Sequence, residues 1–339
     1  ALILALSIGL IISVILLLAA AQLVTFMGAT DVTHQHALTY IKIRVLGMPA
    51  VLITMTSFGI LYGLGNMRTP LFIAVGVNVL NICLDGVLIF GFGPLPALGI
   101  AGAAIASSAS QFLGAIACVV ILHRAIGFTL DIELRNMKRL IKIGRDMLFR
   151  TGSMILFLLL ATRLATGLGA EAGAVNQAIR QVWVFTAFFL DATAVVAQSV
   201  IGYYYGAANK IEARQVAAYV CGWSLFLGLL LMIVMLALSA QVASLLVPTL
   251  GGELFFSAWI VASIFQPIAA IAFVTDGIHW GTGDFRYLRN AVVCATSFSC
   301  CLLIIAEYYS FASLTLIWWI TGLWICLRAV FGILRIWPG

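Results

Sequence analysis

Long runs of apolar residues recur along the whole 339-residue chain and constrain its fold more than any other feature. Each run is about twenty residues long, enough for an α-helix to cross a hydrocarbon core of roughly 30 Å. Hydrophobic residues make up 63% of the chain and charged residues 9%, whereas charged residues make up about a quarter of soluble domains. We therefore predict an all-α polytopic membrane protein in which no room remains for a soluble domain.

Ten membrane-spanning segments can be placed on these runs. They are expected at 1–27, 39–63, 70–91, 98–123, 146–168, 173–204, 214–247, 254–281, 287–306 and 313–334. Lys and Arg are concentrated in alternate connections, such as Arg68, 124–145 and Arg286, while the connections at 92–97 and 169–172 contain neither residue type. Cytoplasmic loops carry the excess of Lys and Arg, so we predict a multi-pass protein of the inner (plasma) membrane with both chain ends cytoplasmic. The net charge of +6 then reflects topology and does not indicate nucleic-acid binding.

One ten-residue block occurs twice, as GILYGLGNMR at 59–68 and as GIHWGTGDFR at 277–286. A Pro lies ten residues before each copy, Pro49 and Pro267, and the offset, 277 minus 59, is 218 residues throughout. A shared offset across a Pro, three Gly and an Arg predicts a duplicated unit of several helices. Because both copies lead from a helix into an inner turn that carries an Arg, the halves are expected to be parallel repeats that enclose a substrate path.

The duplication also predicts the domain organisation. Shifted by 218 residues, the segments 146–168 and 173–204 fall before residue 1, so we expect ten transmembrane helices of a twelve-helix protein. The expected parts are an N-lobe of four helices, N-terminally incomplete, at 1–123, a cytoplasmic basic linker at 124–145 on the inner membrane surface, and a C-lobe of six helices at 146–339.

Ionisable residues inside a bilayer cost roughly 2.5–3.5 kcal/mol each at mid-helix, so each one requires an explanation. Asn78, Asn81 and Asp85 are spaced i, i+3 and i+7, which places them on one helix face. Their counterparts 218 residues later include no acid: they are Thr296, Ser299 and Leu303. A carboxyl in apolar surroundings favours its protonated form, so Asp85 is a candidate proton or cation site with Asn81 as its hydrogen-bond partner. The alternative is a structural polar contact between helices.

A second polar stripe follows the segment 173–204. Its members, with the neighbouring Arg and one of the surrounding aromatic residues, are Gln177, Arg180, Gln181, Phe188, Asp191 and Gln198. Ring faces and apolar surface suit a large, partly apolar organic cation, so this stripe is a candidate substrate cavity. Polar packing between helices explains the glutamines equally well.

Other polar residues permit weaker predictions. Asp276 is expected either to line a cavity or to be solvated at the inner face, and Glu307 to be a surface acid at an outer helix end. Arg44 is expected near the outer start of its helix. The pair His34 and His36 is weak evidence for metal because a third ligand is missing, and no metal site is predicted.

No catalytic constellation occurs in the sequence. We find no Ser-His-Asp set, no HExxH and no phosphate-cradling GxxxxGK[ST] motif, so neither enzyme activity nor ATP hydrolysis is predicted. The seven Cys fall inside apolar runs without CxxC spacing, which argues against a disulfide framework.

Four stretches together carry a family resemblance: YGLGNMRTPLFIAVGVNVLNICLDGVLIF, LGIAGAAIASSASQ, FFLDATAVVAQSVIGYYYGA and QPIAAIAFVTDGIHWGTGDFRYL. They resemble the multidrug and toxic compound extrusion (MATE) transporters, specifically their DinF-type branch. The resemblance implies a two-lobed, twelve-helix antiporter that exports drugs or other organic compounds in exchange for H⁺ or Na⁺. It also implies that Asn81 and Asp85 match the Asn and Asp of the N-lobe cavity, and that Ser107 matches a hydroxyl residue, usually Thr, on the next helix.

The resulting hypothesis is a secondary active transporter that works by alternating access. It exports organic, cationic and drug-like compounds, uses no cofactor besides the coupling ion, contacts membrane lipids and works as a monomer. One rival is a flippase for a lipid-linked precursor, which should have a wide cationic cavity. A second rival is a membrane-embedded enzyme, which would need two convergent catalytic groups at one depth.

Overall fold

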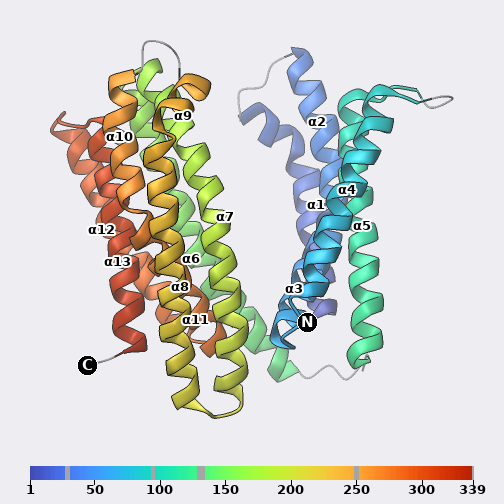
Figure 1. Cartoon of the computed structure of the whole chain (residues 1–339). Coiled ribbons are helices and arrows are strands. Elements are labelled where there is room, and N and C mark those ends of the chain that lie inside the picture. Colours follow the sequence, from blue (N-terminus) through green and yellow to red (C-terminus); the bar gives the residue numbers. More distant parts are fainter. Residues whose placement is uncertain (27–30, 93–95, 128–133, 248–251, 338–339) are drawn as a thin grey trace. The chain divides into compact units, whose positions relative to one another are not determined.

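The computed structural model describes residues 1–26, 31–92, 96–127, 134–247 and 252–337. Every regular element in those ranges is an α-helix, which confirms the predicted fold class. Contacts between residues divide the chain into two compact units, Ala1–Leu140 and Ile141–Gly339. Figure 1 labels α1 to α5 in the first unit and α6 to α13 along the second.

The first unit is built from five helices. They are α1 (Leu2–Phe26), α2 (Asp31–Leu46), α3 (Met48–Gly63), α4 (Arg68–Phe90) and α5 (Gly99–Ile126). The predicted segment 39–63 is a bent pair, because α2 and α3 meet at an angle of 46°. Pro49 lies in the first turn of α3, where its missing N–H leaves no intrahelical hydrogen bond unmade.

The second unit contains eight helices within the described residues. They are α6 (Leu134–Gly167), which begins just before the unit boundary, α7 (Ala170–Gly206), α8 (Lys210–Ala237), α9 (Ser239–Leu246), α10 (Gly252–Ile264), α11 (Gln266–Thr282), α12 (Phe285–Tyr308) and α13 (Leu314–Ile336). Here α10 and α11 form a second bent pair, at 44°, and Pro267 lies in the first turn of α11.

The two bends repeat the same local structure. A Cβ added to Gly9 of α1 would lie 2.6 Å from Pro49 Cα, and one added to Gly228 of α8 would lie 2.8 Å from Pro267 Cα. In each unit a straight helix therefore packs a glycine directly on the proline of the bent pair, where a side chain would clash. The predicted repeat is thus visible in side-chain packing as well as in sequence.

Eight described helices are long and apolar enough to cross a membrane, or up to ten if each bent pair is one span. This range includes the ten predicted segments. The predicted linker at 124–145 differs, because α5 continues to Ile126 and α6 already begins at Leu134. Its residues 128–133 lie outside the described ranges, and its place on the inner membrane surface stays a prediction.

The second copy of the repeated block forms a close helix contact. A Cβ on Gly277 would lie 2.1 Å from the backbone oxygen of Ala194, and one on Gly281 would lie 2.6 Å from that of Gln198. These glycines let α11 approach the backbone of α7, as small-xxx-small spacing does in membranes. In the first unit, the counterparts Gly59 and Gly63 have no described atom within 4 Å of the added Cβ.

Candidate functional site

The first polar site lies where α4 packs against α5. Close packing is possible because Gly102 of α5 has no side chain: an added Cβ would lie 2.3 Å from the backbone oxygen of Leu88. One to two turns along the same helix pair, Asn81 Nδ2 donates a hydrogen bond to Ser107 Oγ at 3.4 Å. The structure therefore brings together two of the four residues predicted for ion coupling.

Asp85 lies one helical turn from Asn81 and is half-buried. Its Oδ1 atom is buried and has no hydrogen-bond partner within the described part of the chain. The predicted hydrogen bond between Asn81 and Asp85 is wrong: no hydrogen bond joins these side chains among the described residues, and the Asn81 amide donates to Ser107. A buried carboxylate oxygen without a hydrogen-bond partner costs free energy, so this atom is free to accept from a ligand.

Asn78 shares the helix face of Asp85 but not its contacts. Its Nδ2 atom donates to the backbone oxygen of Ala74 at 2.8 Å, within α4, and the side chain is exposed. The three residues predicted from spacing therefore share one face of α4, but the hydrogen bond to α5 comes from Asn81 and not from Asn78.

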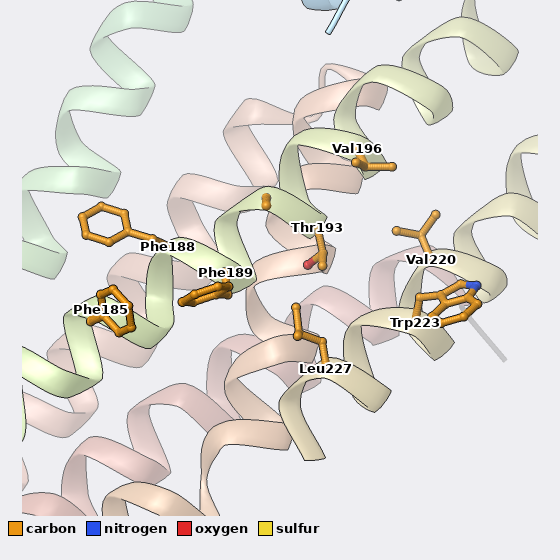
Figure 2. A pocket seen from close by; sticks show the side chains of 9 residues that line it. Phe185, Phe188, Phe189, Thr193, Val196, Val220, Trp223 and Leu227 are labelled. Atoms are coloured by element: carbon orange, nitrogen blue, oxygen red, sulfur yellow. The ribbon is translucent and has the colours of Figure 1, made fainter. Parts of the chain in front are cut away.

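A pocket of about 570 Å³ lies between α7 and α8 in the second unit (Figure 2). Its lining residues are Phe185, Phe188, Phe189, Ala192, Thr193, Val196, Val220, Trp223 and Leu227. The polar groups among them are the Thr193 hydroxyl, which already bonds to Ser224 Oγ at 2.9 Å, and the Trp223 indole N–H. The pocket therefore offers apolar and aromatic surface with almost no free hydrogen-bonding group.

Of the six residues predicted for a substrate cavity, Phe188 alone lines this pocket. At 100° per residue, the exposed Gln177 and Gln181 lie on the same face of α7 as Phe188 but do not line the pocket, whereas the exposed Asp191 lies on a neighbouring face. Arg180 Nη1 donates to Thr162 Oγ1 at 2.9 Å, which fixes it against α6. The polar stripe and the aromatic pocket are thus adjacent surfaces that share Phe188.

The structure also contains a buried charged cluster that the sequence did not reveal. Asp276 of α11 accepts hydrogen bonds at Oδ2 from Arg150 of α6 and from Arg328 of α13, the latter at 2.7 Å. All three residues are at most 7% exposed. The interpretation of Asp276 as a solvated residue at the inner face is therefore wrong. The available signal was the presence of Arg150 and Arg328 within apolar runs, where a cation requires a partner.

Aromatic rings complete the surroundings of this cluster. The Arg328 guanidinium lies 4.8 Å from the Trp324 ring centroid, and that of Arg150 lies 5.2 Å from the Trp280 ring. Two guanidinium groups face one carboxylate, and ring faces stabilise the remaining positive charge.

Two weaker predictions can be compared with the structure. Arg44 lies near the end of α2 beside the bend, where its Nη1 atom donates to Gln111 Oε1 at 3.1 Å, so the expected position at an outer helix start is wrong. Glu307 accepts a hydrogen bond from Arg163 at 3.1 Å, and both side chains are exposed, as expected of a surface acid.

The fold and these sites define a multi-pass, all-helical membrane protein with one bent helix pair in each of two repeated units. The MatE family model matches residues 1–87 and 147–305, and the chain belongs to that family. The resemblance predicted from the sequence is thereby confirmed.

Individual relatives agree with this membership. Protein DETOXIFICATION 42 of Arabidopsis thaliana is 31% identical over 98% of this chain and 64% of its own length. DNA damage-inducible protein F of Escherichia coli is 26% identical over 82% of this chain and 61% of its own length. A crystal structure of a MATE protein in a bent conformation superposes with a TM-score of 0.85 at 22% identity, covering 99% of this chain and 76% of that one, which shows the shared fold. The chain thus spans less than two thirds of the length of these two relatives.

Proposed function

We propose that the protein is a secondary active transporter that exports organic compounds in exchange for H⁺ or Na⁺ by alternating access. Family membership supports transport, and the name of the Arabidopsis relative points to detoxification. We place the chain in the inner membrane, and the asymmetric distribution of Lys and Arg supports an orientation with both of its ends in the cytoplasm.

The observation that carries the coupling mechanism is the buried, unpartnered Oδ1 of Asp85. A proton or Na⁺ at this oxygen neutralises the carboxylate, and the Asn81–Ser107 pair supplies amide and hydroxyl oxygens one turn away. The two conformations of an alternating-access cycle must differ in their affinity for the ion at this site. Ion binding can shift the conformational equilibrium only by this difference in affinity.

The α7–α8 pocket supports an aromatic or otherwise apolar substrate. Its volume of about 570 Å³ lies within the range of about 300–1,000 Å³ that is common for small-molecule sites. Phe188 joins the pocket to the stripe that carries Asp191, so a cationic group has a carboxylate on the adjacent face of α7. We therefore propose amphiphilic organic cations as the substrate class.

The rival functions are less well supported. A lipid-linked precursor flippase needs a wide cationic cavity, whereas the α7–α8 pocket is apolar and the α4 face carries an acid and amides. A membrane-embedded enzyme needs convergent catalytic groups, and the membership of the MatE family argues for transport instead.

The test is export by the natural protein in proteoliposomes, with pH and Na⁺ gradients imposed separately and a fluorescent organic cation as substrate. Asp85→Asn keeps the shape of the side chain but removes its titratable group, so we expect coupled export to be abolished while membrane insertion stays normal. Glu307→Gln is the matched control because it neutralises an exposed acid at a helix end, and it should export normally. Unchanged coupled export by Asp85→Asn would refute the role of Asp85.

A further inference from the structure

A second pocket, of about 450 Å³, lies at the end of the second unit where α7 connects to α8 and α11 to α12. Its polar side is formed by Lys210 and Arg214 from the first turns of α8 and by Arg335 from the last turn of α13. None of these residues belongs to the α4 site or to the α7–α8 pocket.

The positive charges of this basic pocket are only partly neutralised. Asp284, which is its one lining acid, accepts a hydrogen bond from Arg335 Nε at 2.8 Å. Lys210 and Arg214 have no ion-pair or hydrogen-bond partner for their side chains among the described residues. Glu212, the acid between them in sequence, does not line the pocket. The site therefore has an excess of cationic donors.

The opposite wall of the basic pocket is apolar. Ile201, Ala217 and Ile278 line it and are each at most 2% exposed. They belong to a small hydrophobic cluster formed by α7, α8 and α11. The first backbone N–H groups of α8 also lie beside the cationic wall, and a helix N-terminus favours negative charge. A ligand that fills this space must therefore combine an anionic group with apolar surface.

We propose that the basic pocket binds a phosphate-bearing anion, whose oxygens contact Lys210, Arg214 and Arg335 while its apolar portion lies beside Ile336, a half-buried lining residue. The Tyr205 hydroxyl lines the same space as a further donor, whereas the Thr282 hydroxyl donates to the backbone oxygen of His279. A phospholipid headgroup and a soluble phosphate ester share this chemistry. Basic pockets between transmembrane helices on the cytoplasmic side are suited to anionic lipid headgroups, and the inside-positive loops predict that side for Lys210 and Arg214. The proposal does not depend on the transport activity.

The experiment uses the natural protein, purified in detergent, and native mass spectrometry with added phosphatidylglycerol or phosphatidylcholine. We expect phosphatidylglycerol to be retained preferentially. In Lys210→Gln/Arg214→Gln its affinity should fall by about 30-fold, because each cation near an anionic lipid contributes substantially to binding. The control, Lys142→Gln/Arg286→Gln, removes two exposed cations that do not line the basic pocket and should keep wild-type affinity.

A second arm identifies the source of the phosphate. Inorganic phosphate and glycerol 3-phosphate are added alone, and the Tm of the wild type is compared with that of both variants. Stabilisation by phosphatidylglycerol alone supports a lipid, whereas stabilisation of wild type and control by glycerol 3-phosphate supports a soluble ester. Equal phosphatidylglycerol affinity in both double variants, or no preference over phosphatidylcholine in the wild type, would overturn the proposal. All four substituted side chains are exposed, so the variants should fold.

Discussion

Replacing Asp276 by Asn should strongly destabilise the second unit. Asp276 Oδ2 accepts hydrogen bonds from both Arg150 and Arg328, so one substitution leaves two buried guanidinium groups without their carboxylate. Removing one partner of a buried ion pair costs about 3–5 kcal/mol. Because both pairs meet at one oxygen atom, we expect a loss near the upper end, about 5 kcal/mol.

The same reasoning predicts that removing all the charges together is tolerated. In Arg150→Met/Asp276→Leu/Arg328→Met no buried charge is left uncompensated, and apolar replacement of buried ion pairs is often neutral or stabilising. The triple variant should therefore recover most of the stability that Asp276→Asn loses. Glu307→Gln, which breaks an exposed pair, should change the free energy of unfolding by about 0–1 kcal/mol.

The assay is unfolding in mixed micelles titrated with SDS, followed by tryptophan fluorescence, for the wild type and the three variants. A loss below about 1 kcal/mol in Asp276→Asn would refute the argument, because it would mean that the two guanidinium groups find water or other partners. A triple variant less stable than Asp276→Asn would show that packing, and not charge compensation, dominates at this site.

Three further predictions concern packing and binding. Gly277→Ala should cost about 1–3 kcal/mol of unfolding free energy in the same assay, because its Cβ meets the Ala194 carbonyl, whereas Gly222→Ala, which meets no described atom within 4 Å, should not destabilise. Phe188→Ala should raise the KM for an aromatic cation in the vesicle assay, and an unchanged KM would exclude the α7–α8 pocket from the substrate path. Ser107→Ala removes the acceptor of the Asn81 amide, so ion affinity measured by calorimetry should fall about tenfold; equal affinity would contradict a role in coupling.

The spans could be predicted because their cause is local: apolar runs mark the helices. The bends were not predicted, because 39–63 and 254–281 read as single apolar segments, and the structure shows that a new helix begins beside Pro49 and Pro267. The family resemblance matched Asn81 and Ser107 to one cavity, and the structure joins them by a hydrogen bond, whereas the predicted bond between Asn81 and Asp85 is absent. Two residues on one helix face compete with acceptors on the neighbouring helix, and spacing alone does not identify the preferred partner.

The buried charged cluster illustrates why the rest could not be predicted. Arg150 lies 126 residues from Asp276, and Arg328 lies 52 residues from it. Their pairing depends on how α6, α11 and α13 pack against one another. The spacing of residues along the chain does not predict this packing. The α7–α8 pocket has the same origin, since Trp223 and Leu227 of α8 supply its second wall.

The most direct test of ion-coupled export is ion release on substrate binding. In such an antiporter, the bound ion weakens substrate binding and the bound substrate weakens ion binding. Thermodynamic linkage requires the two affinities to fall by the same factor. Adding an organic cation to the purified natural protein in weakly buffered detergent, or after loading with Na⁺, should release H⁺ or Na⁺. Asp85→Asn should still bind the compound but release neither ion. Equal release by the wild type and Asp85→Asn, or substrate binding by the wild type without any release, would contradict the account.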